Sequence, residues 1–264
     1  MRFLTREMYD NMQRNHAYCG FEPIENRAYS EAEIRAFYLK KLDERLASEF
    51  EDHEYMKSVS AEDIAPPDPK RIEREFRASC RAQIKQIGAF YPEWLREYCD
   101  LRLFSYGYLN KSAYDRLKAE CEQMERDFER MEREYREECE RQNIPERINK
   151  AFFTHDDELL GIRKRGKALE MYFRRCGGYD ESEAYRRITF KDARILERDR
   201  ALTPRLSFDE DGRACSNIEF LYYEVFRSER GYEVHTMFFK NGCLPYLTVD
   251  CADVVYDDGA EFKI

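Results

Sequence analysis

His155 and Asp156, followed by Asp157, form the stretch of this sequence that most resembles a reactive site. In metal-dependent phosphohydrolases, an adjacent His and Asp bind a metal ion together with His and Asp side chains from other helices. Here the pair precedes a predicted strand, and the chain has four histidines in all. We favour a turn in which Asp156 or Asp157 accepts hydrogen bonds from nearby backbone N–H groups. A metal-dependent hydrolase that uses His155, Asp156 and Asp157 is the alternative.

Cys176 is a candidate reactive thiol because it follows Arg174 and Arg175. Positive neighbours lower the pKa of a thiol and make it nucleophilic. No base or second cysteine accompanies it, so we favour an unreactive loop cysteine. The nine cysteines never occur as Cys-x-x-Cys. This pattern predicts reduced thiols and neither a disulfide framework nor a zinc site. Glycine-rich nucleotide loops are also absent from the sequence, so we expect no cofactor and no metal.

Asp100 and Arg102 are two positions apart in a predicted short helix. At this spacing two helical side chains do not face each other, so each should bond to another element. We expect a buried Arg102 that clamps its helix to the sheet. A ligand bound by Asp100 and Arg102 is the alternative.

A long helix predicted from Ser112 to Gln142 is the main element that could position these groups. Its apolar residues recur in alternating steps of three and four, which is typical of an amphipathic helix with a narrow apolar seam. Ser112 and Asp115 resemble a capping box. Further helices are predicted at residues 5–14, 30–56, 69–87 and 92–106. The first half is therefore expected to be a helical bundle.

Beyond Pro145 the apolar period changes to two, which indicates strands. Residues 159–164 and 167–173 should form a hairpin, and 187–196, 218–226, 232–239 and 246–251 should be strands. Residues 218–226 carry apolar side chains on both faces, as in a central strand covered on both sides. We expect an α+β fold with a helical bundle domain at 1–150 packed on a mostly antiparallel β-sheet domain at 151–264.

The composition excludes several classes of function. The 264 residues carry a net charge of -9, and the sequence pI is about 5.3. Proteins that bind the phosphate backbone concentrate Lys and Arg, so we expect no nucleic-acid partner. The first residues lack a signal-peptide core, and no window has the length and hydropathy of a membrane span. These features predict a cytoplasmic protein without a membrane partner.

Three segments together resemble a known family. They are Phe3-Leu4-Thr5-Arg6-Glu7-Met8-Tyr9, the residues from Asp100 to Gly107, and the strands around Tyr222-Tyr223-Glu224 and Gly231-Tyr232-Glu233-Val234-His235. The chain is similar over nearly its full length to the bacterial domain-of-unknown-function 4085 family. The resemblance implies a two-part architecture and a bacterial origin. It implies no catalytic residue, cofactor or substrate.

No combination of nucleophile, base and positioning group emerges from the sequence. We therefore expect a non-catalytic protein that binds another protein, rather than an enzyme. An immunity protein that neutralises a bacterial toxin is one concrete version. A monomer is favoured over a homodimer, because a bundle offers the apolar seam of the long helix partners within the same chain.

Overall fold

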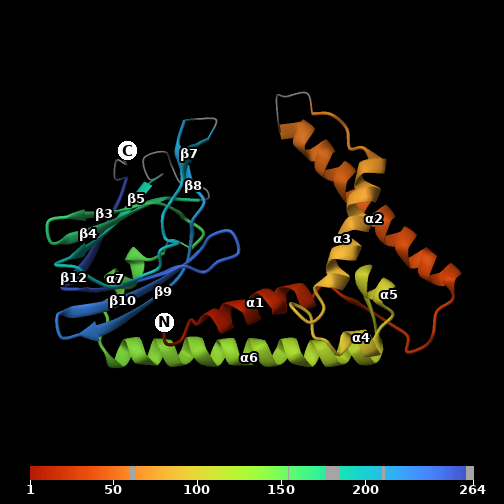
Figure 1. The fold of residues 1–264 in the computed structure, drawn as a ribbon, viewed down its shortest axis with the longest axis horizontal. Coiled ribbons are helices and arrows are strands. Elements are labelled where there is room, and N and C mark those ends of the chain that lie inside the picture. Colours follow the sequence, from red (N-terminus) through yellow and green to blue (C-terminus); the bar gives the residue numbers. More distant parts are fainter. Residues whose placement is uncertain (60–63, 154, 177–184, 210–211, 260–264) are drawn as a thin grey trace. The chain divides into compact units, whose positions relative to one another are not determined.

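The computed structural model describes all residues except 60–63, 154, 177–184, 210–211 and 260–264. The fold is α+β, as predicted (Figure 1). The helices are α1 (Arg6–Tyr18), α2 (Glu31–Val59), α3 (Pro69–Lys85), α4 (Leu95–Tyr98), α5 (Leu101–Ser105), α6 (Lys111–Arg141) and α7 (Glu146–Ala151). Within the described ranges, none of these helices combines the length and the apolar character needed to cross a lipid bilayer.

Most strands belong to the second half of the chain. The strands are β1 (Glu22–Ile24), β2 (Tyr108–Asn110), β3 (Glu158–Arg165), β4 (Ala168–Arg174), β5 (Tyr185–Lys191), β6 (Arg194–Arg198), β7 (Leu206–Phe208), β8 (Ala214–Ser216), β9 (Glu219–Ser228), β10 (Gly231–Phe239), β11 (Tyr246–Cys251) and β12 (Asp253–Asp258). The predicted hairpin is β3–β4. The single strand expected at 187–196 is instead two strands, β5 and β6, because Asp192 adopts a positive φ of 50° and turns the chain.

The chain forms two compact units. The helical unit is Asp10–Asp127, and the sheet unit combines Met1–Tyr9 with Phe128–Ile264. The division therefore falls inside α6, whereas the sequence pattern placed a boundary at residue 150.

Local capping fixes where the helices of the helical unit begin. Ser30 and Glu33 form a reciprocal capping box at the start of α2, with the Ser30 N–H donating to Glu33 Oε2 over 2.8 Å. A hydrogen bond from Arg27, followed by the bonds from Ser30, lowers the pKa of Glu33 to about 2. Asp68 caps α3 ahead of Pro69, as predicted.

The start of α6 differs from the prediction. Asn110 Oδ1, and not Ser112, accepts the Ala113 N–H over 2.9 Å, so Asn110 caps the helix. Ser112 instead bonds to Asn26 through both its N–H and its hydroxyl. Asn110 also ends β2, which pairs in parallel with β1. This small sheet in the helical unit has no counterpart in the predicted all-helical bundle.

The core of the helical unit combines α1, α4, α5, β2 and the first half of α6. Its buried members are Tyr18, Phe21, Ile87, Tyr91, Leu95, Phe104, Leu109, Ala113, Leu117 and Cys121. Several of the aromatic rings make edge or stacked contacts, such as Phe21 with Phe104 at 5.2 Å between centroids.

Among the described residues, the large sheet has the order β12-β5-β4-β3-β9-β10-β11-β6. The antiparallel pairing is continuous except between β3 and β9, where one residue pair, Glu158 and Glu219, joins the strands. Strands β11 and β12 lie far apart in this order, yet only Ala252 connects them. The sheet must therefore roll up to bring them together. Phe152 and Ile148 of the α7 segment fill the resulting apolar interior.

The first residues of the chain are held against β9 by a buried carboxylate. Glu224 has no exposed surface and accepts the backbone N–H groups of Arg2, Phe3 and Leu4 over 2.6, 2.7 and 2.5 Å. The Phe3 ring lies 6.3 Å from that of Phe226, and the Arg2 guanidinium lies over the same ring at 4.0 Å. We call Met1–Thr5 the N-terminal arm.

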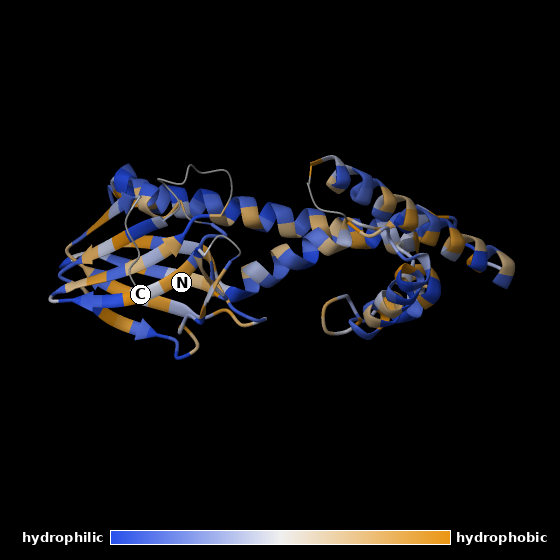
Figure 2. Cartoon of the chain, turned by 90° about the horizontal axis from the view of Figure 1, so that it is seen from above, coloured by the Kyte–Doolittle hydropathy of each residue, from blue (hydrophilic) through white to orange (hydrophobic). Residues whose placement is uncertain are grey.

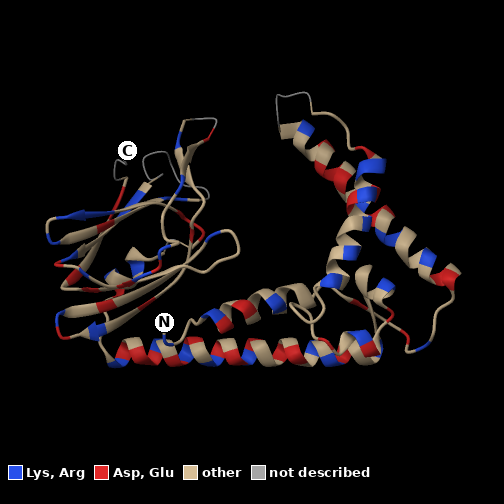
Figure 3. Cartoon of the chain, viewed as in Figure 1, with Lys and Arg blue, Asp and Glu red and all other residues tan. Residues whose placement is uncertain are grey.

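The outer surface of α6 is densely charged. Hydrophilic residues predominate along the helix, with apolar residues at intervals (Figure 2), and acidic and basic residues alternate along its length (Figure 3). Many are paired one turn apart, such as Lys118 with Glu122 and Arg130 with Glu134. These pairs are about half exposed, so each stabilises the helix by only a few tenths of a kcal/mol, roughly 0.2–0.5.

Candidate functional site

A groove lined mainly by aromatic and apolar side chains lies in the sheet unit. It is formed by the arm, the last turns of α6, the α7 segment and β9. Its volume is about 760 Å³, within the usual range for ligand sites. The apolar and aromatic lining residues are Leu4, Phe128, Met131, Tyr135, Cys139, Phe152, Phe153, Leu221, Tyr222 and Tyr223. We call it the aromatic groove.

The groove lies where β9 no longer pairs with its neighbour β3. Beyond Phe220, whose N–H donates to the Asp157 carbonyl over 2.9 Å, no residue of β9 pairs with β3. Helix α6 covers the far end of this edge, since Val225 N–H donates to Tyr135 Oη over 2.9 Å and Arg227 N–H donates to Gln142. A strand edge with exposed N–H and C=O groups is a template for pairing.

Tyr223 lies between the two covered parts of that edge. Its N–H points to the same side as that of Val225, because alternate residues of a strand share one edge. Among the residues that the structure describes, the Tyr223 N–H has no acceptor. Asn149 Oδ1 in the same groove is buried and likewise has no partner in the described part of the chain. Both residues line the groove, which therefore holds one backbone donor and one buried side-chain acceptor without partners.

Burial keeps the tyrosines of the groove neutral. It raises the pKa of Tyr223 to about 12, with Cys139 adding to the effect, and it also raises the pKa of Tyr222. Both phenols therefore remain hydrogen-bond donors at neutral pH. Burial also raises the pKa of the Cys139 thiol, which disfavours the nucleophilic thiolate.

The rim of the groove is polar. It carries Glu132, Arg136, Glu146 and His155. His155 is about half exposed, its Nδ1 lies 3.0 Å from Asp156 Oδ1, and its ring lies edge-on to Tyr222 at 5.4 Å. The structure therefore puts His155 beside the groove and pairs it with Asp156, which adopts the left-handed conformation of a turn with φ 66°.

Asp157 does not join His155 and Asp156. It is buried, and its Oδ1 accepts the Cys176 N–H over 2.9 Å. Burial raises its pKa above the usual range. Across the described ranges, no three His, Cys, Asp or Glu side chains are close enough to hold a metal ion. This bond joins residues 19 positions apart, so it is not the local turn hydrogen bond that the sequence predicted for Asp157.

Cys176 is exposed, but the pKa of its thiol is raised, whereas an activated thiol has a lowered pKa. Desolvation raises its pKa, and the carboxylates of Glu158 and Asp157 raise it further, while Arg174 lowers it. The guanidinium of Arg174 is committed to Asp209 at 2.6 Å. The arginines that precede Cys176 therefore do not activate it.

The structure corrects two expectations about Asp100 and Arg102. They do pair, with Arg102 Nη2 2.8 Å from Asp100 Oδ2, because Asp100 caps α5 in an extended conformation and the helical spacing rule does not apply to it. Arg102 is also exposed, and its Nη1 bonds to Glu31 of α2 over 2.8 Å. It joins α5 to α2 through Glu31, whereas the sequence predicted a clamp to the sheet.

The aromatic groove was not predicted from the sequence. The signal that could have indicated it is the run of apolar residues on both faces of residues 218–226, beside the paired aromatics Phe152 and Phe153. That pattern predicted a covered central strand. It could not show that β3 leaves β9 and opens the edge.

Comparison of the chain with protein-family models, with curated proteins and with solved structures gives no match. The resemblance to the domain-of-unknown-function 4085 family stays a prediction.

Proposed function

We propose that this protein is a non-catalytic binding protein whose aromatic groove receives an extended, apolar segment of a partner protein. The observation that carries the proposal is the open strand edge at Tyr223, which faces the groove together with the buried Asn149 Oδ1. A peptide backbone supplies the two missing groups, because its C=O accepts from Tyr223 and its N–H donates to Asn149.

The walls of the groove favour apolar side chains in this segment. Phe153 is 65% exposed at the lip, so a ligand that covers it removes apolar surface from water. Leu221 and Met131 lie deeper, at 7% and 9% exposure. The mixed charges on the rim orient a partner without demanding one overall charge.

We place this function in the cytoplasm of a bacterium, in keeping with the resemblance and with the sequence. Neutralisation of a toxin is one form that such binding could take. We also infer a monomer, and the burial of Leu117, Cys121 and Met131 by other parts of the same chain supports this inference. A hydrolase built on His155, Asp156 and Asp157 is not proposed, since Asp157 turns to Cys176.

The test is selection of binding peptides from a random peptide library displayed on phage, with the intact chain as the target. We expect enriched peptides rich in apolar residues. The Phe153→Asp variant should weaken their binding about tenfold or more, because it puts a charge at the lip of an apolar site. N-methylation of the peptide amide that meets Asn149 should weaken binding by about twofold to tenfold, the net effect of one hydrogen bond.

Phe208 provides a matched control, because it is a 60% exposed phenylalanine of the same unit that does not line the groove. The Phe208→Asp variant should keep the affinity of the unchanged protein. Equal losses in the two variants, or the absence of any enriched peptide that distinguishes them, would contradict the proposal.

A further inference from the structure

A second hollow lies in the helical unit, between α2, α3 and α5, and does not depend on the aromatic groove. Its volume is about 490 Å³. Each helix contributes residues one turn apart, so that one face of each helix lines the hollow. These include Ile34, Arg35 and Tyr38 of α2, and Arg77, Arg81 and Ile84 of α3. We call it the arginine cleft.

The charge around the cleft contrasts with that of the chain. Four arginines and one glutamate line it, whereas the whole protein has a net charge of -9. Two of the arginines are held in place: Arg102 bonds to Glu31 and Asp100, and Arg77 bonds to Glu73 and to the Tyr38 hydroxyl. These bonds stiffen the two edges of the cleft.

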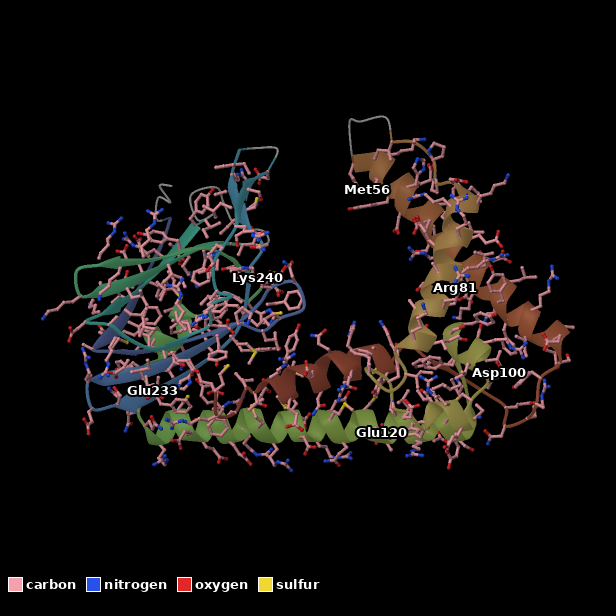
Figure 4. The ribbon with its side chains drawn as sticks, in the orientation of Figure 1. Met56, Arg81, Asp100, Glu120, Glu233 and Lys240 are labelled. Carbon is pink, nitrogen blue, oxygen red and sulfur yellow. The ribbon has the colours of Figure 1, made fainter. Side chains whose placement is uncertain are left out.

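The other two guanidiniums are available to a ligand. In the described part of the chain, neither Arg35 of α2 nor Arg81 of α3 has a hydrogen-bond or ion-pair partner. Arg81 is labelled on α3 in Figure 4, with Asp100 near the start of α5. The cleft therefore presents two uncompensated positive charges from two helices that pack together.

The floor of the cleft is apolar and aromatic. Ile34 is 4% exposed and Cys80 is 7% exposed. The rings of Tyr38 and Tyr106 meet edge to face at 5.4 Å. Burial raises the pKa of Tyr106, so its phenol stays protonated. A ligand that fits this cleft combines an anionic group with an apolar or planar body.

We propose that the arginine cleft binds a small organic phosphate, with the phosphoryl group between Arg35 and Arg81 and the organic group over Tyr38 and Tyr106. A phosphomonoester carries a charge of about -1.5 to -2 and three acceptor oxygens, which matches two guanidiniums. A single carboxylate carries one charge and would leave one guanidinium uncompensated. The planar fork of Arg suits both groups, so the charge decides between them.

The test is isothermal titration calorimetry of the intact chain with phenyl phosphate, inorganic phosphate and benzoate. We expect phenyl phosphate to bind with a Kd of about 1 mM or lower, and at least about tenfold more tightly than the other two. Arg35→Gln and Arg81→Gln should each weaken binding about tenfold or more. Because the arginines are exposed, added salt should also weaken binding.

Arg74 is the matched control, since it is an exposed arginine of α3 that does not line the cleft and has no partner in the described ranges. Arg74→Gln should leave the affinity unchanged, and all three variants should keep the thermal melting of the unchanged protein.

Four results would overturn the proposal. They are no binding at millimolar phenyl phosphate, equal binding of inorganic phosphate, an equal loss in Arg74→Gln, and a phosphotyrosine peptide that binds tenfold more tightly than phenyl phosphate. The last result would assign the cleft to a modified protein. Peptide binding at the aromatic groove is measured separately, so failure of either proposal leaves the other standing.

Discussion

Glu224 should control the docking of the N-terminal arm, and Glu224→Gln tests this without changing the size of the side chain. In the structure Oε1 accepts the N–H groups of Phe3 and Leu4, and Oε2 accepts that of Arg2. An amide has one acceptor oxygen, so at least one of the three N–H groups loses its acceptor. The remaining bonds change from charge-assisted to neutral, which lowers the contribution of each from about 1.5–3 to about 0.5–1.5 kcal/mol.

Together these losses should destabilise the docked arm by about 2–4 kcal/mol, since the released N–H groups can bond to water. Hydrogen exchange measured by mass spectrometry on the first residues should therefore speed up by a factor of roughly 30 or more. Glu219→Gln is the control, because Glu219 is an exposed residue of the same strand. If the arm exchanges at the same rate in Glu224→Gln as in the unchanged protein, the carboxylate does not hold it.

Three further predictions concern stability. Gly231→Ala should destabilise the protein by roughly 3 kcal/mol or more in urea unfolding, because φ is +144° and a Cβ would lie 2.5 Å from the Ala252 carbonyl oxygen. Gly166→Ala is the control, since φ is +59° with open space around the Cβ, and it should lower the free energy of unfolding by about 1 kcal/mol. Asn110→Ala removes the cap of α6 and should lower the free energy of unfolding of the helical unit by about 1 kcal/mol. Ser112→Ala should lower it less, and the fluorescence of the single tryptophan reports the unfolding of both variants. Burial lowers the pKa of His235 below 6.5 despite its bond to Glu233, so the unfolded chain binds the proton more readily. The free energy of unfolding should then fall as pH drops from 6.5 towards the folded pKa, by at most about 1.4 kcal/mol per pH unit. His235→Gln should remove this pH dependence, as measured by urea unfolding at several pH values.

Elements defined by local patterns were predicted well. The seam of α6 and the capping residues before α2 and α3 gave boundaries within a few residues of the observed ones. The hairpin β3–β4 was predicted because its turn at Gly166 and its two strands are contiguous. In each case the residues that determine the structure lie within one or two turns of each other.

Features that depend on distant pairing were not predicted. The order of strands in the rolled sheet requires β11 and β6 to meet, although they are separated by about 50 residues, and no local signal encodes that contact. The start of α6 was misplaced for a similar reason, because Ser112 bonds to Asn26 in a distant loop and leaves the cap to Asn110. The Asp100–Arg102 pair was not predicted, because the spacing rule for helical residues was applied to Asp100, which precedes the helix.

The two candidate sites differ in how far the sequence could reveal them. For the arginine cleft, Arg77 and Arg81 stand one turn apart in a predicted helix, so their common face could be read from spacing alone. That Arg35 lines the same cleft as Arg81 depends on the packing of α2 against α3. The aromatic groove depends even more on tertiary structure, since it exists only where β3 and β9 separate.

The N-terminal arm links the stability of the fold to the aromatic groove. Leu4 lines the groove, and its N–H donates to Glu224. Any ligand that contacts Leu4 in the groove therefore binds the docked arm more tightly than the released arm, and by linkage the ligand must stabilise docking by the same factor. Conversely, a partner that needs the space of Leu4 must first break the bonds to Glu224. For a partner segment that contacts Leu4, release of the arm lowers the affinity of the groove, and the three hydrogen bonds to Glu224 oppose that release.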